Sequence, residues 1–225
     1  GKSKILIESG GYLGDQEKQV IRKLNFIVIL SALKSISEGS YRLLPVKGYW
    51  EIPRNYRSLF DLKIEKMTVP YLGQEYLVDL GIVYDEVENK SHTDFYYVGK
   101  VADIGDLSTH FGYESISAEG LSFKTGETYP KIIPDFESFR ELDIPQLLKD
   151  GYTSVSIDDL PEEILFIDYP INIIDIRKIQ IPKNNQMPKP PVGLEKNPTF
   201  LLTRNGQVVF AVINGFVYAM EGDKN

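Results

Sequence analysis

The chain has 225 residues, of which 42% are hydrophobic and 25% are charged, with a formal net charge of −7. This composition excludes global disorder, and the acidic balance argues against a nucleic acid duplex as partner, because duplex binding draws on a surplus of Lys and Arg. The chain has no cysteine, which excludes disulfides, thiol nucleophiles and structural Cys–zinc sites, and no stretch reaches the roughly 18 apolar residues of a membrane span.

The N-terminal region contains the most ambiguous segment. Lys4–Glu8 reads as a short strand. Phe26–Leu30 is a continuous, partly β-branched apolar run, which predicts a central strand over about Leu24–Ala32, buried on both faces. A helix through Gln16–Ile36 is the alternative, because several apolar residues there also recur at helical spacing. Tyr41–Val46 is the next expected strand.

The middle of the chain mixes helical and alternating patterns. Ser58–Met67 is expected to be a helix with a serine cap. Tyr76–Tyr84 and Asp94–Ala102 alternate and are expected to pair as strands. Phe136–Lys149 looks helical, and Pro145 is expected to divide it into two pieces.

The C-terminal region carries the strongest local signal. Leu165–Ile181 reads as a strand, and Pro182–Pro191, with four prolines, reads as an extended linker. Asn205-Gly206 and Asn214-Gly215 predict two-residue hairpin turns, because both residues of such turns accept positive φ. The continuous apolar run in the middle strand predicts that this meander docks on the main body. The expected strands are Thr199–Thr203, Gln207–Ile213 and Phe216–Met220.

One segment resembles a known family. Trp50-Glu51-Ile52-Pro53-Arg54 is similar to the stretch before the catalytic box of Nudix hydrolases of the ADP-ribose pyrophosphatase type, and the order of expected strands over roughly Leu24–Thr153 also fits. The resemblance implies an α+β fold in which residues 1–165 form a mixed β-sheet flanked by helices (Nudix-like). Residues 166–225 would then form an extension with the Pro-rich linker and a C-terminal three-stranded antiparallel meander.

The catalytic box of that family is largely missing. The family gathers divalent cations with several glutamates on one helical face. In the corresponding stretch, Asp61 to Lys66, Glu65 alone matches, and Lys63 and Lys66 would repel a metal. The resemblance therefore implies a pseudoenzyme that needs no cofactor, with Mg²⁺ expected only in an active hydrolase.

A ligand site is expected around the resembling segment. A nucleobase could stack on Trp50, and the guanidinium groups of Arg54 and Arg57 suit phosphate oxygens. The predicted ligand-binding residues are Trp50, Glu51, Arg54, Arg57 and Tyr96. The competing interpretation is a core tryptophan, surface arginines and a tyrosine packed between strands. No metal site is predicted, because His92 and His110 have no second ligand at a suitable spacing.

Three functional hypotheses follow. The first is a non-catalytic or weakly catalytic Nudix-like domain that binds a nucleotide or phosphate compound, or serves protein assembly as a homo-oligomer or with a protein partner. The second is a metal-dependent hydrolase of nucleoside-diphosphate compounds with relocated carboxylates. The third is a structural protein of a virion or cell surface, unrelated to Nudix. Neither a membrane nor a duplex is an expected partner, and a cytoplasmic location is expected, with a removed signal peptide as the alternative because the chain begins with Gly1. The catalytic candidates are Glu65, Glu86 and Glu88, with Glu114 and Glu127 as further relocated carboxylates.

Overall fold

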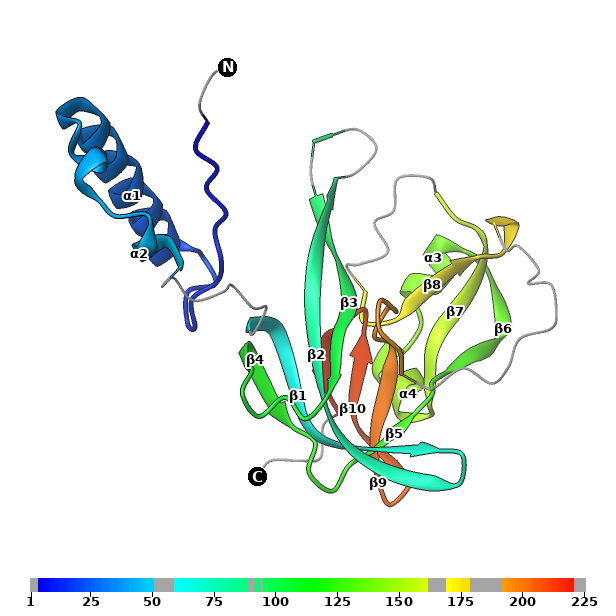
Figure 1. Ribbon diagram of the computed structural model, residues 1–225. Coiled ribbons are helices and arrows are strands. Elements are labelled where there is room, and N and C mark those ends of the chain that lie inside the picture. The colour runs from blue at the N-terminus through cyan, green and yellow to red at the C-terminus, as the bar shows by residue number, and fades with distance from the viewer. Residues whose placement is uncertain are drawn as a thin grey trace.

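The computed structural model describes residues 4–50, 59–88, 92–93, 95–161, 169–178 and 192–220. It contains an eight-stranded sheet in the order β11-β10-β9-β5-β1-β2-β3, with β4 also paired to β1, and a three-stranded sheet in the order β6-β7-β8 (Figure 1). The chain is therefore broadly α+β with few helices, as the sequence predicts at that level.

The strands are β1 (Leu59–Tyr71), β2 (Gln74–Glu88), β3 (Phe95–Gly105), β4 (Phe111–Ser117), β5 (Ser122–Lys124), β6 (Glu127–Asp135), β7 (Tyr152–Asp159), β8 (Asn172–Asp175), β9 (Phe200–Arg204), β10 (Gln207–Ile213) and β11 (Phe216–Ala219). The helices are α1 (Gln19–Glu38), α2 (Lys47–Trp50), α3 (Phe136–Arg140) and α4 (Ile144–Lys149), and the 3₁₀ helices are η1 (Ser40–Leu43) and η2 (Ile176–Lys178).

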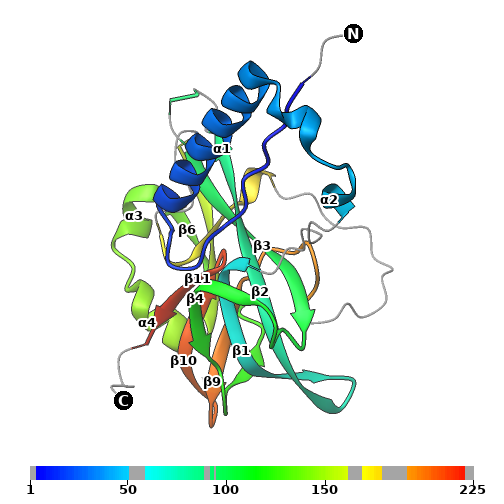
Figure 2. The ribbon, with the colours of Figure 1, turned by 60° about the vertical axis from the view of Figure 1, so that its left-hand side comes forward.

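Residues 4–50 form an N-terminal arm that stands beside the sheets. The arm consists of an extended stretch, α1, η1 and α2, and α1 projects away from the rest of the protein (Figures 1 and 2). The predicted strand over Phe26–Leu30 is wrong, because this run lies inside α1. The strand expected at Tyr41–Val46 is also wrong, because η1 occupies most of it. With no neighbouring strand to pair with, these residues satisfy their backbone donors and acceptors within a helix.

Asp15 fixes the start of α1. Its side chain is buried, and its two carboxylate oxygens accept hydrogen bonds from the backbone N–H groups of Gln19 (2.7 Å), Val20 (2.9 Å) and Ile21 (3.1 Å). The first turn of a helix has no intrahelical partner for these donors, so a carboxylate at this place stabilises the helix.

We expect Asp15→Ala to loosen the first turn of α1. Loss of the three hydrogen bonds should cost about 1–2 kcal/mol of helix stability and speed the exchange of the Gln19, Val20 and Ile21 amides. Hydrogen–deuterium exchange measures this, and Glu17→Ala is the matched control because no α1 donor bonds to its exposed side chain. Unchanged protection in Asp15→Ala would show that the carboxylate does not hold the helix.

Strand β1 replaces the helix that the sequence predicts over Ser58–Met67. Phe60, Leu62 and Ile64 are buried in alternation, and they pack in the core while β1 pairs with β2 on one side and β4 on the other. A bulge interrupts the register between Ile64 and Met67, where Lys66 adopts a φ of +57°. The serine-cap signal was therefore misleading, and burial on a sheet decided the local structure.

Two other expectations for the middle of the chain are confirmed. Strands β2 and β3 pair antiparallel, with Val83 opposite Lys100 and Val87 opposite Tyr96. The helical segment is divided into α3 and α4, which begin at the side-chain caps of Asp135 and Asp143. Pro145 lies in the first turn of α4, where its missing N–H costs nothing.

The C-terminal strands belong to the main sheet. Strand β10 pairs antiparallel with β9 and β11, and both Asn-Gly turns have positive φ at both residues, as expected for two-residue hairpins. Strand β9 continues the sheet by pairing with β5, so these strands dock on the main body. Of the strand expected at Leu165–Ile181, residues 172–175 form β8; the remaining part and the Pro182–Pro191 linker fall mostly outside the described residues.

The two ends of the main sheet meet. The N–H of Val101 donates to the carbonyl of Lys196 (2.9 Å), and the N–H of Gly99 donates to the side-chain oxygen of Asn214 (2.9 Å). A Cβ at Gly99 would collide with the backbone carbonyl of Asn214, so this contact requires glycine. The sheet thereby encloses a core contributed by strands β1, β2, β3, β5, β9 and β10 and by the turn between β4 and β5: Leu62, Ile64, Met67, Val69, Leu80, Ile82, Val101, Ala118, Leu121, Phe123, Phe200, Leu202 and Val212.

A second layer packs beside this sheet. Strands β6, β7 and β8 are parallel, and α3 covers them through Phe139. Helix α4 contributes Leu148 to a small cluster with Leu201 and Ala211, which joins the second layer to the main sheet.

Candidate functional site

The main catalytic candidates, Glu65 and the pair Glu86 and Glu88, lie in two separate places, and the further candidates Glu114 and Glu127 are on β4 and β6. Glu65 is on β1 beside the bulge, where its carboxylate bonds to the ammonium of Lys63 (2.9 Å). Glu86 and Glu88 lie near the C-terminal end of β2. Asp79, on the same strand, faces the bulge beside Glu65, and Glu86 is seven residues further along the strand. At about 3.3 Å per residue, the two places are roughly 23 Å apart. No shared active site can form from these residues.

A recess lies at the end of the β2–β3 hairpin. It has a volume of about 370 Å³ and is lined by Glu86, Glu88, His92, Thr93 and Phe95. His92 Nδ1 lies 2.6 Å from the carboxylate of Glu88, and both side chains are exposed. In the part of the chain that the structure describes, no three His, Cys, Asp or Glu side chains gather as a metal site requires. One solvated His–Glu pair gives neither a metal centre nor a positioned nucleophile.

The predicted ligand-binding residues do not form a described pocket. Trp50 ends α2 in the arm, where it is 77% exposed and meets Tyr49 edge to face. Tyr96 lies on β3 beside Val87, on the face of the hairpin opposite Glu86 and Glu88. Glu51, Arg54 and Arg57 lie outside the described residues. The interpretation of Trp50 as a core aromatic is wrong, because most of its surface is open to solvent.

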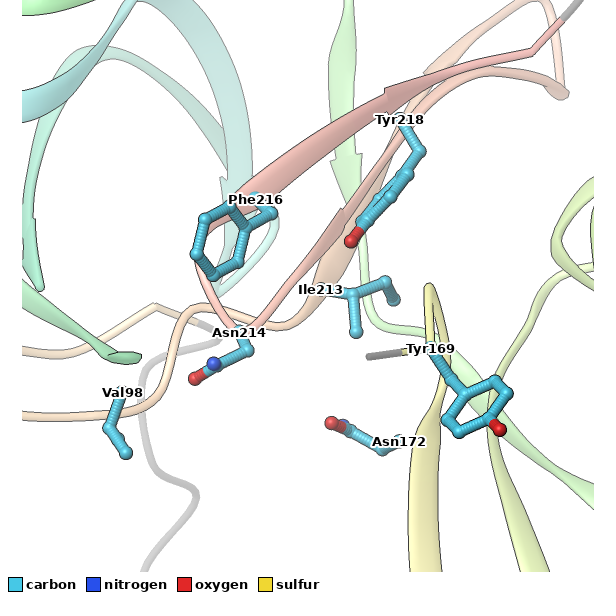
Figure 3. Close-up of a pocket in the computed structure, with 7 residues that line it drawn as sticks. All are labelled: Val98, Tyr169, Asn172, Ile213, Asn214, Phe216 and Tyr218. Carbon is cyan, nitrogen blue, oxygen red and sulfur yellow. The ribbon is translucent and has the colours of Figure 1, made fainter. Parts of the chain in front are cut away.

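A small cavity lies between the two sheets (Figure 3). Its volume is about 160 Å³, and its lining includes Tyr169 and Asn172 from the second layer and Asn214 and Tyr218 from the C-terminal strands. The other lining residues are Val98, Ile213 and Phe216. Burial raises the pKa of the Tyr218 phenol above its ordinary value, so this group stays protonated at neutral pH. None of the seven lining residues is a carboxylate, a cation or a histidine, so the cavity offers no acid–base pair and no phosphate clamp.

Asn214 in this cavity already serves the fold. Its side-chain oxygen accepts from Gly99 N (2.9 Å) and Asn197 Nδ2 (2.6 Å), and its side-chain nitrogen donates to the carbonyl of Tyr97 (2.9 Å). Next to it, the Tyr84 hydroxyl donates to the carbonyl of Gly215 (3.0 Å), and burial raises the Tyr84 pKa far above its ordinary value. These polar groups hold the β10–β11 turn against β3. Sequence reasoning identified the turn but not this second role of Asn214.

A buried cation lies beneath the bulge of β1. The Lys63 side chain is 6% exposed, and its ammonium lies 2.9 Å from Glu65 and 4.0 Å from Asp79. Asp79 also accepts hydrogen bonds from the backbone N–H groups of Lys66 (2.9 Å) and Leu107 (3.2 Å). The arrangement is a satisfied ionic network that joins β1, β2 and the loop after β3.

The arm carries most of the exposed large apolar side chains in the part of the chain that the structure describes. Of 28 exposed large apolar side chains in the described residues, 20 belong to residues 4–50. No residue of α1 is buried. Phe26 to Leu30 are five consecutive apolar residues, and successive helical residues are about 100° apart, so this stretch of α1 is apolar on all sides. Nine of its ten large apolar residues are 39–62% exposed, and Ile21 is half-buried; the nine are Val20, Leu24, Phe26, Ile27, Val28, Ile29, Leu30, Leu33 and Ile36.

The arm joins the rest of the protein through the turn ahead of α1. The N–H of Tyr12 donates to the Tyr113 hydroxyl (3.1 Å), and the Gln16 amide donates to the Glu114 carboxylate (3.4 Å). A Cβ at Gly11 would collide with Leu59 and Tyr113, so the turn lies close against β1 and β4. Among the described residues, no helix has both the length and the apolarity needed to cross a bilayer.

The chain shows little similarity to known proteins. No model of a known protein family matches the chain, and no curated protein matches it. Among solved structures it is similar to D-aminoacylase, with 21% identity and a TM-score of 0.31 over 44% of this chain and 18% of that chain. It is also similar to N-acyl-D-glutamate deacylase from Bordetella bronchiseptica, with 20% identity and a TM-score of 0.30 over the same shares. The chain thus spans less than a fifth of the length of these proteins.

The resemblance to Nudix hydrolases is wrong. The run expected as the central strand, Phe26–Leu30, is in helix α1, and the stretch Asp61 to Lys66, expected on the catalytic helix, is in strand β1. A strand directs successive side chains to opposite faces, so it cannot gather carboxylates as one helical face does.

Proposed function

We propose that this chain is a non-catalytic assembly protein in which the arm docks on another protein surface. The observation that carries the proposal is α1, whose central stretch Phe26–Leu30 is apolar on all sides and in which no residue is buried. A helix of this kind is normally found buried among other protein elements. Exposed apolar patches that are much larger than those of ordinary monomers mark interaction sites.

Burial of the exposed α1 side chains offsets much of the free-energy cost of docking. Full burial of a Val, Leu, Ile or Phe side chain contributes about 1.5–3 kcal/mol, so covering the exposed half of each α1 residue adds roughly 1 kcal/mol. The nine residues together supply roughly 9 kcal/mol, which lies within the roughly 4–15 kcal/mol that association costs in lost translational and rotational freedom. The remaining apolar residues of the arm add to this.

The lack of assembled chemistry in the described residues supports a non-catalytic role. Glu65 is committed to Lys63, and Glu86 and Glu88 lie in an exposed recess far from it. The cavity between the sheets is smaller than the roughly 300–1,000 Å³ of typical ligand sites, and its asparagine is bonded to the fold.

We expect the triple variant Phe26→Gln, Ile29→Gln and Leu33→Gln to abolish docking without changing the melting temperature. These side chains are exposed, so the fold does not depend on them. Light scattering and binding of an apolar fluorescent dye measure the effect: the wild-type chain should either self-associate or bind the dye, and the variant should do neither.

The matched control is Leu77→Gln, Ile132→Gln and Leu194→Gln, which removes equally exposed apolar side chains outside the arm. This control should behave like the wild type. A wild-type chain that is monomeric, binds no dye and is indistinguishable from the arm variant would refute the assembly role.

A further inference from the structure

We infer that the arm of one copy docks on the acidic body of a second copy, with α1 lying against the end of its β2–β3 hairpin. This rests on the proposed role of the arm as a docking element and adds the identity of its partner. Three observations carry it: the charges of the two parts, the chemistry of the hairpin end and the size of the apolar surface.

The arm and the rest of the chain carry opposite net charges. Residues 4–50 contain seven Lys and Arg against four Asp and Glu, which gives +3. Residues 51–225 contain 17 Lys and Arg against 28 Asp and Glu, which gives −11, and Lys2 completes the total of −7. Two arms therefore repel each other, whereas an arm and a body attract, and charge complementarity of this kind selects and orients partners. The charges favour arm-on-body contact over a bundle of α1 helices.

The end of the β2–β3 hairpin offers matching chemistry. Glu86 lies opposite Tyr97, and Glu88 lies opposite Phe95, so all four side chains share one face of the hairpin. The rings of Phe95 and Tyr97 meet edge to face at 5.6 Å and are 50% and 38% exposed. The recess of about 370 Å³ opens between these carboxylates and Phe95.

Helix α1 carries the complementary groups in one continuous stretch. Arg22 and Lys23 directly precede the uncharged, largely apolar segment Leu24–Leu33. That segment is about 15 Å long at 1.5 Å per residue. Its side chains can cover the exposed aromatic rings while the two cations reach Glu86 and Glu88.

The apolar area of the arm is sufficient for a stable contact. Twenty half-exposed apolar side chains leave roughly 900 Å², taking about 45 Å² for each from the transfer energies of such groups. A standard specific interface buries about 800 Å² per partner. If each of two copies docks its arm on the other, the two interfaces are equal and the dimer is closed. If each arm instead docks on a further copy, the contact repeats and builds an open chain of copies.

A charge-swap experiment on the full chain tests this contact. In the arm variant, Arg22→Glu and Lys23→Glu place an acidic arm against an acidic hairpin; in the hairpin variant, Glu86→Lys and Glu88→Lys place a basic hairpin against a basic arm. Each variant alone should dissociate about tenfold more readily than the wild type at low salt. In an equimolar mixture, both interfaces of the mixed dimer pair opposite charges, so sedimentation should show dimer restored to the wild-type level.

Two controls accompany the mixture. Glu75→Lys with Glu141→Lys changes the body charge equally at exposed sites outside the hairpin end and should leave the dimer intact. Because the chain has no cysteine, Lys23→Cys mixed with Glu88→Cys should give a disulfide-linked mixed dimer, whereas Lys23→Cys alone should not cross-link.

Other outcomes overturn the inference. A mixture that stays dissociated, or efficient cross-linking of Lys23→Cys alone, would show that α1 packs on another surface of its copy. A wild-type monomer that binds the apolar dye would show that another protein covers the arm. A monomer that sediments with phosphatidylglycerol vesicles would show a lipid surface. Where another protein surface covers the arm, the assembly role stands; binding to lipid vesicles, or a monomer without dye binding that is indifferent to the glutamine variant, overturns the assembly role as well.

Discussion

Phe200→Ala is expected to lower the free energy of unfolding by about 3–5 kcal/mol, because it opens a cavity in a core that cannot collapse freely. Phe200 is 2% exposed, pairs with Val212 across the sheet and packs its ring against Phe123 at 5.2 Å. It belongs to a C-terminal strand but fills the same core as Leu62 and Ile82. The whole main sheet should therefore lose stability together, which chemical denaturation followed by fluorescence and circular dichroism measures.

The matched control is Phe26→Ala, the same substitution on the exposed helix α1. Phe26 is 62% exposed, so its truncation should change the stability of the monomer by less than about 0.5 kcal/mol. A small effect of Phe200→Ala, or separate unfolding of the C-terminal strands, would show that these strands do not share the core of the main sheet.

Lys63→Met should destabilise the protein by about 3 kcal/mol. Removing one member of a buried ion pair leaves the other charge uncompensated, and the methionine keeps most of the side-chain volume. Here the loss of the ammonium leaves Asp79, which is 16% exposed, facing only backbone donors. Denaturant titration gives the change, and the double variant Lys63→Met with Asp79→Asn should lose less than the sum of its two single variants.

Lys66→Met provides the comparison on the same strand. Lys66 also forms an ion pair, with Glu119 at 3.0 Å, but the side chains are 54% and 69% exposed. Exposed pairs contribute about 0–1 kcal/mol, so this variant should stay close to the wild type. Equal losses for Lys63→Met and Lys66→Met would show that burial of the Lys63 ammonium does not matter to the fold.

Part of the candidate site could have been found from the sequence. Phe60-Asp61-Leu62-Lys63-Ile64-Glu65 alternates apolar and charged residues without exception, which is the pattern of a half-buried strand. Giving this alternation more weight than the serine cap would have identified β1 and removed the catalytic helix. The recess at Glu86, Glu88 and Phe95 needed the register of β2 on β3, because the residues come from two strands.

The exposure of the arm could not be predicted from its residues. Phe26–Leu30 fits a buried strand and a buried helix equally well, since a continuous apolar run has no period. Both interpretations assume burial within the same chain, and α1 has none. Only the tertiary structure shows that this run pairs with none of the described strands and that its side chains are exposed.

The sequence by itself determined the features that depend on nearby residues. Asn205-Gly206 and Asn214-Gly215 form their turns because two adjacent residues tolerate positive φ, and Asp135 and Asp143 cap α3 and α4 over three residues. The tertiary structure decided everything that depends on distant partners. Strand β9 pairs with β5 across nearly 80 positions, Lys63 is buried because Asp79 and Glu65 surround it, and α1 is a helix because no strand lies beside it. Hydrogen bonds within a turn or cap are fixed by local geometry, whereas burial and sheet pairing depend on which distant segments the fold brings together.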